Sequence, residues 1–274
     1  MLLSEKEFKK IAELVYRRTG IFLDEKKYST TGKKIEKFIQ ENGYDNFRSF
    51  FHEIRFSKDD KLFQSLINVV TVNETYFFRE NYQFETLINY VLPELHKIRP
   101  INEVIRILCA PSSTGEEPYS IALHLLQENK LVEERDFEIF GIDIDSTVIE
   151  KAKKGIFSKR SIQFLPPKLL KEYFTQLDNN SYQIADSLRE VIEFKVVNVM
   201  NKLELRRLGK FDVIFSRNML IYFDDASRKE VAMNFYEILK LKGYVFLGHA
   251  ESMNRIVSVF RAKKLGESIV YQKP

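Results

Sequence analysis

The sequence has a single cysteine among its 274 residues, which excludes an intramolecular disulfide framework and any metal site rich in cysteine. That residue, Cys109, follows an apolar run, so we expect a buried, unreactive thiol rather than a nucleophile. No stretch approaches the roughly 18 consecutive apolar residues of a membrane-spanning helix. The first residues, MLLSEKEFKK, lack the apolar region of a signal peptide. These absences predict a cytoplasmic protein without direct membrane insertion.

An excess of charge of one sign is also missing. The 43 Lys and Arg residues, set against 39 Asp and Glu residues, give a net charge of +4. This mild basic bias leaves an acidic protein partner or a membrane surface open. Because no dense basic stripe is interleaved with aromatic residues, we expect no nucleic-acid partner. With 44% hydrophobic residues, the chain is long enough to bury the cores of two domains.

Helical patterns fill the first 75 residues. Ser4 and Glu7 form a capping-box pattern ahead of an apolar helix face that ends before Gly20. Three further helices are predicted: one through 35–39 that ends near Gly43, one capped by Asp45, and one over 62–70. We therefore predict an all-helical N-terminal domain over 1–75, followed by a linker and connecting helix over 76–100.

From residue 101 to residue 274, short apolar β patterns alternate with helical patterns, which predicts an α/β domain with a largely parallel sheet. The predicted strands are 104–108, 137–142, 191–197, 211–215 and 244–247, with a closing hairpin of 261–265 and 268–271. The predicted helices are 118–127, 147–154 (capped by Ser146 and stopped by Gly155) and 227–239. Such sheets bind ligands at the carboxyl ends of their strands.

The region 157–190 does not follow this alternation. It contains Pro166-Pro167 and the turn-rich Asp178-Asn179-Asn180, and it is too long for a plain connection. We interpret it as an insertion, partly β, at the edge of the sheet. Its role in binding a partner and a purely decorative role both remain open.

The loop APSSTGEEPYS lies between the first predicted strand and a helix, where small-residue loops commonly bind phosphate. Here Glu116 and Glu117 follow Gly115 directly, and two carboxylates would repel a phosphate. The helix dipole favours acidic residues in the first turn, so it accounts for one of the two without a functional role.

The second predicted strand ends in GIDID, which places Asp143 and Asp145 at its tip. A carboxylate there can accept both hydroxyl hydrogens of a ribose, although capping the following helix is the alternative role. The sequence has neither GxGxxG nor GxxxxGK[ST]. This combination favours a positively charged ligand with a ribose and no phosphate, and S-adenosylmethionine (SAM) matches each of these features.

Two further segments carry polar and aromatic side chains. In SRNMLIYFD, Asn218 offers an amide to an adenine edge or a substrate, and the Tyr222 ring can face a sulfonium. Packing under the next helix is the alternative role, which we prefer for Phe223. In NETYFFRE, at the seam between the domains, Arg79 can bind a carboxylate through two hydrogen bonds. A salt bridge from Arg79 to Glu80, Glu85 or another surface acid is the alternative.

Together these segments resemble the chemotaxis receptor methyltransferases, the CheR family. NETYFFRE resembles the NxTxFFRE segment of that family, and STGEEPYSIA is similar to its central signature. GIDID with EKAKKGIF resembles DID…A..GIY, SRNMLIYFD resembles RNVxIYFD, and GHAES resembles GHSE. The matching segments occur in the family's order over residues 73–251.

The resemblance implies a SAM-dependent protein-glutamate O-methyltransferase that acts on chemoreceptor signalling helices without a metal. It implies a Rossmann-like SAM domain with an inserted small β subdomain, preceded by a helical domain. Arg79 and Tyr222 match proposed catalytic positions. The matched cofactor-contacting positions, with VVNVM supplying the pair 198–199, are Asn73, Thr75, Arg79, Glu117, Asp143, Asn198, Val199, Arg217 and Asn218.

The sequence departs from the family at two places. Pro111 stands in the cofactor loop and has no N–H, so a backbone contact through that amide is impossible. The insertion lacks the glycine-rich turn of members that bind a receptor C-terminal peptide, so recruitment through such a tether is in doubt.

A glutamate carboxylate has a pKa of about 4.3 and is ionised at neutral pH, so methyl transfer to it needs no general base. The enzyme must align the carboxylate oxygen with the methyl carbon at roughly 3–3.5 Å and remove water. We expect Arg79 to orient the carboxylate and Tyr222 to shape the methyl pocket.

We expect a monomer whose acidic receptor partner docks on the insertion and on lysines on or near the second helix: Lys26, Lys27, Lys33, Lys34 and Lys37. A solvated helix face is the alternative role of these lysines. A non-catalytic SAM-sensing or scaffold protein, and a methyltransferase for another protein, a small molecule or a nucleic acid, also remain open.

Overall fold

The computed structural model describes residues 2–128 and 130–274, which form two compact units. The first unit contains the residues up to 72 together with 221–228, and the second contains 73–220 and 229–274. Within the described residues, no helix combines the length and the apolar character that crossing a bilayer would require.

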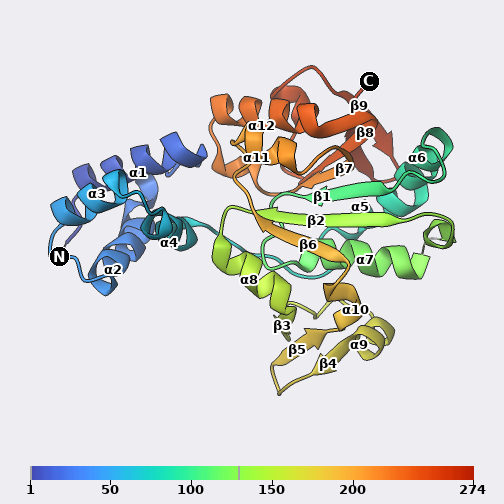
Figure 1. Ribbon diagram of the computed structural model, residues 1–274, viewed down its shortest axis with the longest axis horizontal. Helices are drawn as coiled ribbons and strands as arrows, with labels where there is room; N and C mark the ends of the chain where they lie inside the picture. The colour runs from blue at the N-terminus through green and yellow to red at the C-terminus, as the bar shows by residue number, and fades with distance from the viewer. Residues whose placement is uncertain (1, 129) are drawn as a thin grey trace. The chain divides into compact units, whose positions relative to one another are not determined.

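The first unit is helical, as predicted (Figure 1). Its elements are α1 (Glu5–Thr19), η1 (Glu25–Lys27), η2 (Tyr28–Gly32), α2 (Lys33–Glu41), α3 (Phe47–Phe56) and α4 (Lys61–Val70). The Ser4–Glu7 capping box is present, with Ser4 N–H donating to Glu7 Oε2 at 2.8 Å. The predicted cap of the third helix was wrong: Asn46, not Asp45, accepts a hydrogen bond from Ser49 N–H.

The segment 221–228 is held to the helical unit by contacts with α1 and with the chain that follows it. Tyr16 donates its hydroxyl hydrogen to Asp224 Oδ2 at 2.8 Å. Ile21 forms an isolated antiparallel bridge with Phe223, and Phe22 N–H donates to the carbonyl oxygen of Tyr222 at 2.8 Å. A short segment of the α/β chain is thereby incorporated into the helical unit.

The second unit is built on a seven-stranded sheet in the order β6-β2-β1-β7-β8-β10-β9. The neighbours from β6 to β8 pair in parallel, and the last two strands form the predicted antiparallel hairpin. The strands are β1 (Ile105–Cys109), β2 (Phe137–Asp143), β6 (Ile192–Val196), β7 (Phe211–Ser216), β8 (Leu239–Leu247), β9 (Arg261–Leu265) and β10 (Ser268–Gln272). β8 starts at Leu239 rather than at residue 244, because the chain passes from α12 into the strand without a loop.

Helices cover both faces of this sheet, with α7 and α8 on one face and α11 and α12 on the other (Figure 1). The helical elements of this chain region are α5 (Asn81–Thr86), η3 (Leu87–Val91), α6 (Leu92–Ile98), α7 (Glu116–Glu128), η4 (Lys130–Glu133), α8 (Ser146–Lys154), α9 (Pro167–Tyr173), α10 (Asp186–Arg189), α11 (Lys202–Arg207), η5 (Leu220–Tyr222), α12 (Asp225–Ile238) and η6 (Met253–Arg255).

Both ends of α8 were predicted from the sequence, with a cap at Ser146 and a stop at Gly155. Asp145 caps the helix, because its side chain accepts hydrogen bonds from Thr147 N–H and Val148 N–H. Ser146, the predicted cap, is instead the first helical residue. Gly155 ends the helix in a left-handed conformation with a φ of 63°, as predicted.

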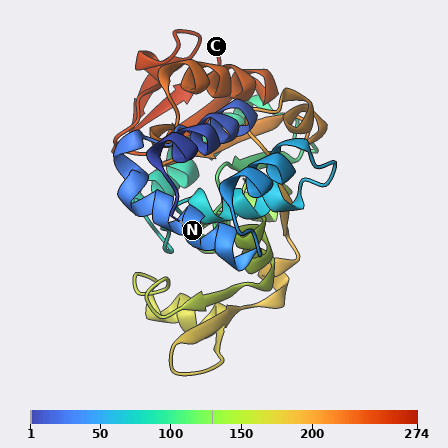
Figure 2. The same cartoon turned by 90° about the vertical axis from the view of Figure 1, so that its left-hand side faces the viewer.

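The insertion forms its own antiparallel sheet of β3 (Ile156–Ser158), β5 (Ser181–Ile184) and β4 (Phe174–Gln176), in the order β3-β5-β4. It follows β2 and α8 in the chain and precedes the edge strand β6. Figure 2 shows this small sheet apart from the large one, as does Figure 1. The predicted Rossmann-like fold with an inserted β subdomain is therefore confirmed.

The position of β1 in the large sheet creates a place for a ligand. The chain continues from β1 to β2 on one side, whereas β7 pairs with β1 on the other side. The carboxyl ends of these parallel strands meet where the order reverses, which is where open α/β sheets bind ligands.

Asp212 fixes the start of β7. Its carboxylate is fully buried and accepts hydrogen bonds from Arg99 Nε at 2.7 Å, Lys240 Nζ at 2.8 Å and Arg106 N–H at 3.0 Å. Removing one partner of a buried ion pair leaves uncompensated charge, which commonly costs about 3–5 kcal/mol.

We therefore expect Asp212→Asn to lower the free energy of unfolding of the α/β unit by about 3 kcal/mol, measured by urea denaturation. Glu237→Gln is the control, because the Arg206–Glu237 pair is largely exposed and should contribute within about 1 kcal/mol. Equal losses for the two variants would contradict this assignment.

Candidate functional site

Four polar segments lie at the carboxyl ends of neighbouring parallel strands. They are the loop 110–115 after β1, residues 143–145 at the end of β2, residues 197–199 after β6, and residues 216–218 at the end of β7. The proposed cofactor-binding residues of the α/β domain other than those of the 73–80 segment lie in or directly after these segments. Adjacent strand ends therefore bring these segments to one edge of the sheet.

Asp143 joins the first loop to the second strand. Its Oδ2 accepts a hydrogen bond from Ser113 N–H at 2.9 Å, and its Oδ1 accepts one from Asp145 N–H at 3.0 Å. Burial raises the pKa of Asp143 to about 6, although these backbone hydrogen bonds favour the ionised form and act in the opposite direction. The structure thus holds a buried carboxylate beside the loop after β1, at the position predicted to contact a ribose.

Asp145 has a different role from Asp143. Besides capping α8, its Oδ2 accepts a hydrogen bond from Asn73 Nδ2 at 2.8 Å. Ser113 donates its hydroxyl hydrogen to the carbonyl oxygen of Asn73 at 3.2 Å. The start of the 73–80 segment is thereby fixed against both strand-end loops.

A chain of charged groups crosses the site. Glu117 Oε2 lies 3.0 Å from Arg217 Nη1, and Glu80 Oε2 lies 3.5 Å from Arg217 Nη2. Glu80 Oε1 lies 2.9 Å from His249 Nδ1. Arg217 is buried and also donates to the carbonyl oxygen of Arg79. One buried guanidinium therefore connects the end of β7, the first turn of α7 and the 73–80 segment.

Burial and charge shift the acidic groups around this guanidinium. Desolvation raises the pKa of Glu117, while the nearby Arg217 charge acts to lower it. Burial, followed by the Glu117 charge, raises the pKa of the Cys109 thiol. Cys109 is fully buried, which agrees with the prediction of an unreactive thiol.

Several polar atoms at the site are buried without a strong partner. Among the described residues, Ser112 Oγ, Ser216 Oγ and Arg217 Nε have no hydrogen-bond partner. Glu117 Oε1 has none beyond the weak thiol donor of Cys109. A buried polar atom without a hydrogen bond commonly costs about 1–3 kcal/mol. Such atoms fit a site whose remaining hydrogen bonds come from a ligand.

The backbone is strained in the same segments. In the part of the chain that the structure describes, the non-glycine residues with positive φ are Phe78, Glu80, Ser113, Asn218 and Lys242. All but Lys242 belong to the polar segments of the site. Residues held in such conformations cluster at functional sites, because the surrounding contacts must compensate for their cost. Phe78 and Glu80 flank Arg79 and so fix the direction of its backbone.

Among the described residues, Arg79 forms no salt bridge with Glu80 or Glu85. Its Nη1 donates to the carbonyl oxygen of Glu74 at 3.0 Å, and its guanidinium carbon lies 5.9 Å from the centre of the Tyr76 ring. Glu80 instead pairs with Arg217 and His249, and Glu85 accepts a hydrogen bond from Asn81. The alternative role, a salt bridge to Glu80 or Glu85, is therefore not observed in the described chain, because both carboxylates have other partners.

The remaining predicted residues lie in three places. Thr75 is partly buried in the 73–80 segment. Asn198 Oδ1 accepts a hydrogen bond from Met200 N–H at 3.0 Å, and the carbonyl oxygen of Val199 accepts one from Asn234 Nδ2 at 2.9 Å. Asn218 follows β7 in a left-handed conformation, with a φ of 57°. The turn after β6 is therefore fixed by its own side chain and by α12.

Tyr222 belongs to the helical unit and not to the unit that contains Arg79. Lys27 Nζ lies 5.7 Å from the centre of its ring. Phe223 is buried, with 5% of its surface exposed, which agrees with the packing role preferred for it. The sequence motif therefore divides between two units, with Arg217 and Asn218 in one and Tyr222 in the other.

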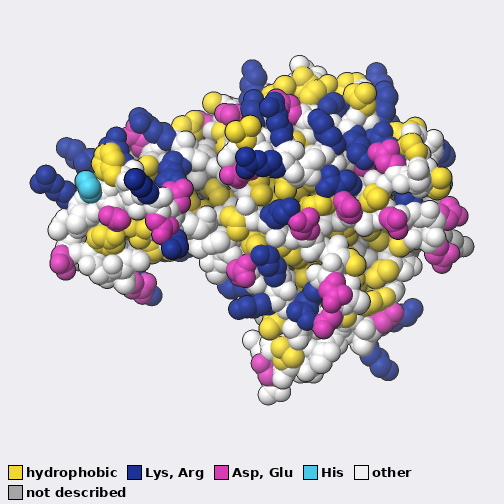
Figure 3. Space-filling model, viewed as in Figure 1, with side chains coloured by type: hydrophobic (Ala, Val, Ile, Leu, Met, Phe, Trp, Pro, Cys, Tyr) yellow, Lys and Arg dark blue, Asp and Glu magenta, His cyan; other side chains and the backbone are white. Residues whose placement is uncertain are grey.

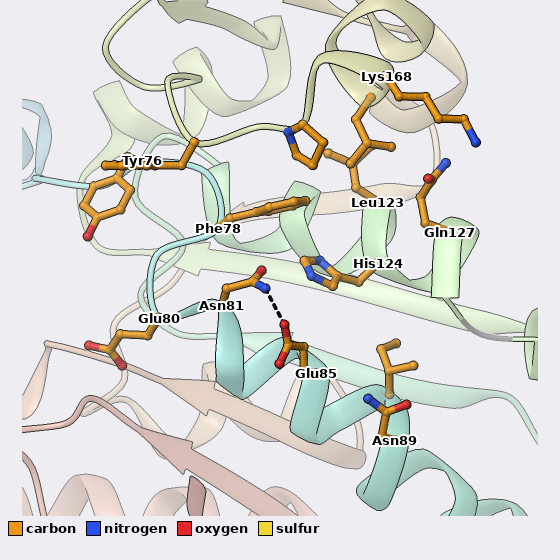
Figure 4. A pocket seen from close by; sticks show the side chains of 14 residues that line it. Tyr76, Phe78, Glu80, Asn81, Glu85, Asn89, Leu123, His124, Gln127 and Lys168 are labelled. Carbon is orange, nitrogen blue, oxygen red and sulfur yellow. Dashed lines mark hydrogen bonds between the residues drawn. The ribbon is translucent and has the colours of Figure 1, made fainter. Parts of the chain in front are cut away.

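A cavity of about 850 Å³ borders the 73–80 segment, and sequence reasoning did not predict it. Figure 4 shows Phe78 and His124 beside each other in its lining, with ring centres 4.4 Å apart. Its wall combines residues of α5 and α7 with Phe164 and Lys168 from the insertion. The insertion thus contributes directly to the surroundings of the Arg79 segment.

Glu116 links the loop after β1 to the insertion. Its carboxylate accepts hydrogen bonds from Thr114 Oγ1 at 2.5 Å and from Ser161 Oγ at 2.7 Å. Ser161 also accepts a hydrogen bond from Phe77 N–H through its carbonyl oxygen. Glu116 is therefore the structural carboxylate of the pair, whereas Glu117 points to the buried guanidinium.

Sequence reasoning gave no functional role to four residues that the structure places in or beside the site: Glu80, Ser113, His249 and Glu251. Glu80 was named only as an alternative partner of Arg79, and the GHAES segment was recognisable only as part of a matching motif. Within residues 2–128 and 130–274, no group of three His, Cys, Asp or Glu side chains could hold a metal ion.

Comparisons with known proteins agree with the arrangement of the chain. The family model described as "CheR methyltransferase, SAM binding domain" matches residues 73–269, and the model described as "CheR methyltransferase, all-alpha domain" matches 6–71. "Chemotaxis protein methyltransferase 2" of Vibrio cholerae is 42% identical over 274 residues, covering 100% of this chain and 95% of that protein.

Two further relatives carry the name "Chemotaxis protein methyltransferase". The protein from Borreliella burgdorferi is 33% identical and covers 92% of this chain and 89% of its own length. The protein from Salmonella typhimurium is 32% identical and covers 95% of this chain and 88% of its own length. The similarity thus extends over both units.

The carboxyl group of Asp143 should titrate with a pKa of about 6 in the ligand-free protein, well above its ordinary value of 3.8. Because the folded-state pKa is the higher one, the contribution of this group to stability is fully present below about pH 4. It is lost as the pH rises through about 6. The carboxyl carbon shift of Asp143 in NMR spectra measures this directly. A midpoint near 4 would show that the backbone hydrogen bonds fully offset desolvation.

Proposed function

The chain belongs to the CheR methyltransferase family, and we propose that it methylates glutamate side chains of chemoreceptor signalling helices. The family makes it a SAM-dependent methyltransferase of chemotaxis. The products of the proposed reaction are a glutamate methyl ester and S-adenosylhomocysteine. This membership does not favour a non-catalytic SAM-sensing protein.

One observation carries the assignment of the site. Glu117, Glu80 and Asp143 supply three carboxylates, whereas Arg217 supplies one buried cation. This excess of negative charge fits a cationic ligand and disfavours a phosphate. SAM carries an ammonium group and a sulfonium, together with a ribose for Asp143. The match accounts for Glu117 at a place where other sheets of this type carry a phosphate-binding motif.

The residues that we propose for the cofactor lie in the strand-end segments. Asp143 accepts the ribose hydroxyl hydrogens, Glu117 pairs with the ammonium group through Oε1, and Asn218 offers its amide to the adenine edge or the substrate. When bound, SAM would supply the methyl group, and its sulfur would keep the electron pair of the broken carbon–sulfur bond. The remaining proposed contacts are Asn73, Thr75, Arg79, Asn198, Val199 and Arg217.

Arg79 is the proposed orienting residue for the substrate glutamate. Its guanidinium has only a backbone carbonyl oxygen as a strong partner in the described chain, so its other N–H groups can bind a carboxylate. The attacking oxygen must keep its negative charge, because the carboxylate is the nucleophile and no general base is needed. Arg79 therefore binds the oxygen that does not react. Tyr222 shapes the pocket for the methyl group.

We further propose that the domain boundaries are 1–75, 76–100 and 101–274, and that the protein is a cytoplasmic monomer.

The receptor's acidic helices dock on the second helix and on the β insertion. Lys33, Lys34 and Lys37 lie on α2 with exposed side chains, of which Lys37 pairs with Glu41 at 3.5 Å. Figure 3 shows basic side chains interspersed with acidic ones on the face in view, without a continuous stripe for nucleic acid.

Transfer of labelled methyl from SAM to purified receptor cytoplasmic fragments tests the function. We expect base-labile label that is lost with a Glu→Gln receptor and with Asp143→Ala enzyme. Arg79→Ala and Tyr222→Phe should lower kcat at least tenfold at saturating SAM. Calorimetry should show unchanged SAM affinity for Tyr222→Phe and weaker but detectable binding for Arg79→Ala, which is also a proposed cofactor contact. Unchanged kcat in both variants would remove their catalytic assignment. SAM binding without transfer to any receptor would refute the proposed substrate.

Reversing charge on α2 tests the docking surface separately. We expect Lys33→Glu/Lys34→Glu to raise the KM for receptor about tenfold, because two favourable contacts with acidic helices become repulsive. SAM affinity should stay within about twofold. Lys58→Glu/Lys61→Glu makes the same charge change elsewhere in the helical unit and should leave the receptor KM unchanged. Equal effects of the two pairs would show general electrostatics instead of docking on α2.

A further inference from the structure

The GHAES segment, 248–252, follows β8 and has no role in the function described so far. Its Glu251 Oε2 accepts two backbone hydrogen bonds, from Asn218 N–H and from Gly248 N–H, each at 2.9 Å. Asn218 follows β7 and Gly248 follows β8, which are neighbouring parallel strands. One carboxylate oxygen therefore ties together the carboxyl ends of two strands at the site.

The position of Asn218 depends on this tie. Its φ of 57° is a left-handed conformation, which asparagine tolerates better than most residues but which still needs support from its surroundings. Gly248 approaches it closely: a Cβ added there would lie 2.8 Å from Asn218 Nδ2 and 3.0 Å from Asn218 N. The loop after β8 thus surrounds the Asn218 backbone and side chain from one side.

The same loop also reaches the segment that contains Arg79. His249 Nδ1 lies 2.9 Å from Glu80 Oε1, and Glu80 Oε2 accepts a hydrogen bond from Gln83 Nε2 at 3.0 Å. Gln83 in turn donates to the carbonyl oxygen of Leu247, the last residue of β8. Residues 247–251 therefore contact both segments that flank the buried Arg217.

We infer that Glu251 is a positioning residue, which holds Asn218 in the left-handed conformation that directs its amide to the cofactor. The inference rests on the proposed cofactor role of Asn218. Glu251 acts through the backbone and touches neither SAM nor the substrate. The two N–H groups need an acceptor at this point, and the negative charge of that acceptor is secondary.

A pair of substitutions separates the acceptor from the charge. Glu251→Gln keeps an oxygen acceptor and removes the charge, whereas Glu251→Met keeps the length and removes the acceptor. We expect Met to weaken SAM binding about tenfold, measured by calorimetry, and Gln to change it by less than about threefold. Glu267→Met, at an exposed glutamate of the β9–β10 turn, is the control and should leave binding unchanged.

Amide hydrogen exchange in the SAM-free protein gives a readout independent of activity. We expect Glu251→Met to accelerate exchange at Asn218 and Gly248 without a comparable change along β1, and Glu251→Gln to restore protection. The Cβ of Gly248→Ala would lie 2.8 Å from Asn218 Nδ2 and 3.0 Å from Glu251 Oε2, so this variant disturbs the same contact without removing the carboxylate and should weaken SAM binding as well. It serves as the second test if Glu251→Met does not fold.

A double-variant cycle with Asn218→Ala distinguishes an error in the proposed cofactor role of Asn218 from an error in the positioning role of Glu251. If Asn218→Ala leaves SAM affinity unchanged, the proposed cofactor role of Asn218 is wrong. If Asn218→Ala weakens binding but Glu251→Met does not, the positioning role is overturned. The inference requires that Glu251→Met adds little to the loss already caused by Asn218→Ala. Fully additive losses would show that Glu251 acts on another part of the site.

Discussion

The buried guanidinium of Arg217 is the constraint on which the site depends. A buried cation is costly unless anionic or carbonyl groups surround it. Glu117 from the first turn of α7, Glu80, and the backbone of Arg79 provide those groups. The end of β7, the loop after β1 and the 73–80 segment therefore converge because each supplies what one charge needs. The loop after β8 joins them through His249.

Negative charge still exceeds positive charge around Arg217, and this imbalance separates the site from other ligand sites on the same type of sheet. A phosphate-binding loop presents backbone N–H groups to an anion. Here the corresponding loop donates Ser113 N–H inward to Asp143, and α7 begins with two glutamates. The loop has its usual place between strand and helix, but its donors are used within the protein. Of the two glutamates, Glu116 is hydrogen-bonded to Thr114 and Ser161, whereas Glu117 keeps one oxygen for a cation.

The sequence predicted the features that depend on neighbouring residues. The capping box at Ser4, the stop at Gly155 and the β patterns of the sheet are local, and the structure confirms them. The sequence did not reveal which polar side chains pair with one another. Glu80 pairs with Arg217 and His249 because two strand ends meet there, and no spacing along the chain reveals that meeting. Asp145 and Ser146 are both good caps, so only the structure could distinguish them.

The segment 221–228 makes the helical domain inseparable from the rest of the chain. It lies between β7 and α12, yet its partners, Tyr16 and Ile21, belong to the N-terminal region. A fragment that starts at residue 73 would retain Phe223 without the surface that buries it. Recombination could therefore not add or delete the helical domain as an independent unit. Any gain, loss or exchange of it during evolution would have required matching changes in the stretch that carries Tyr222.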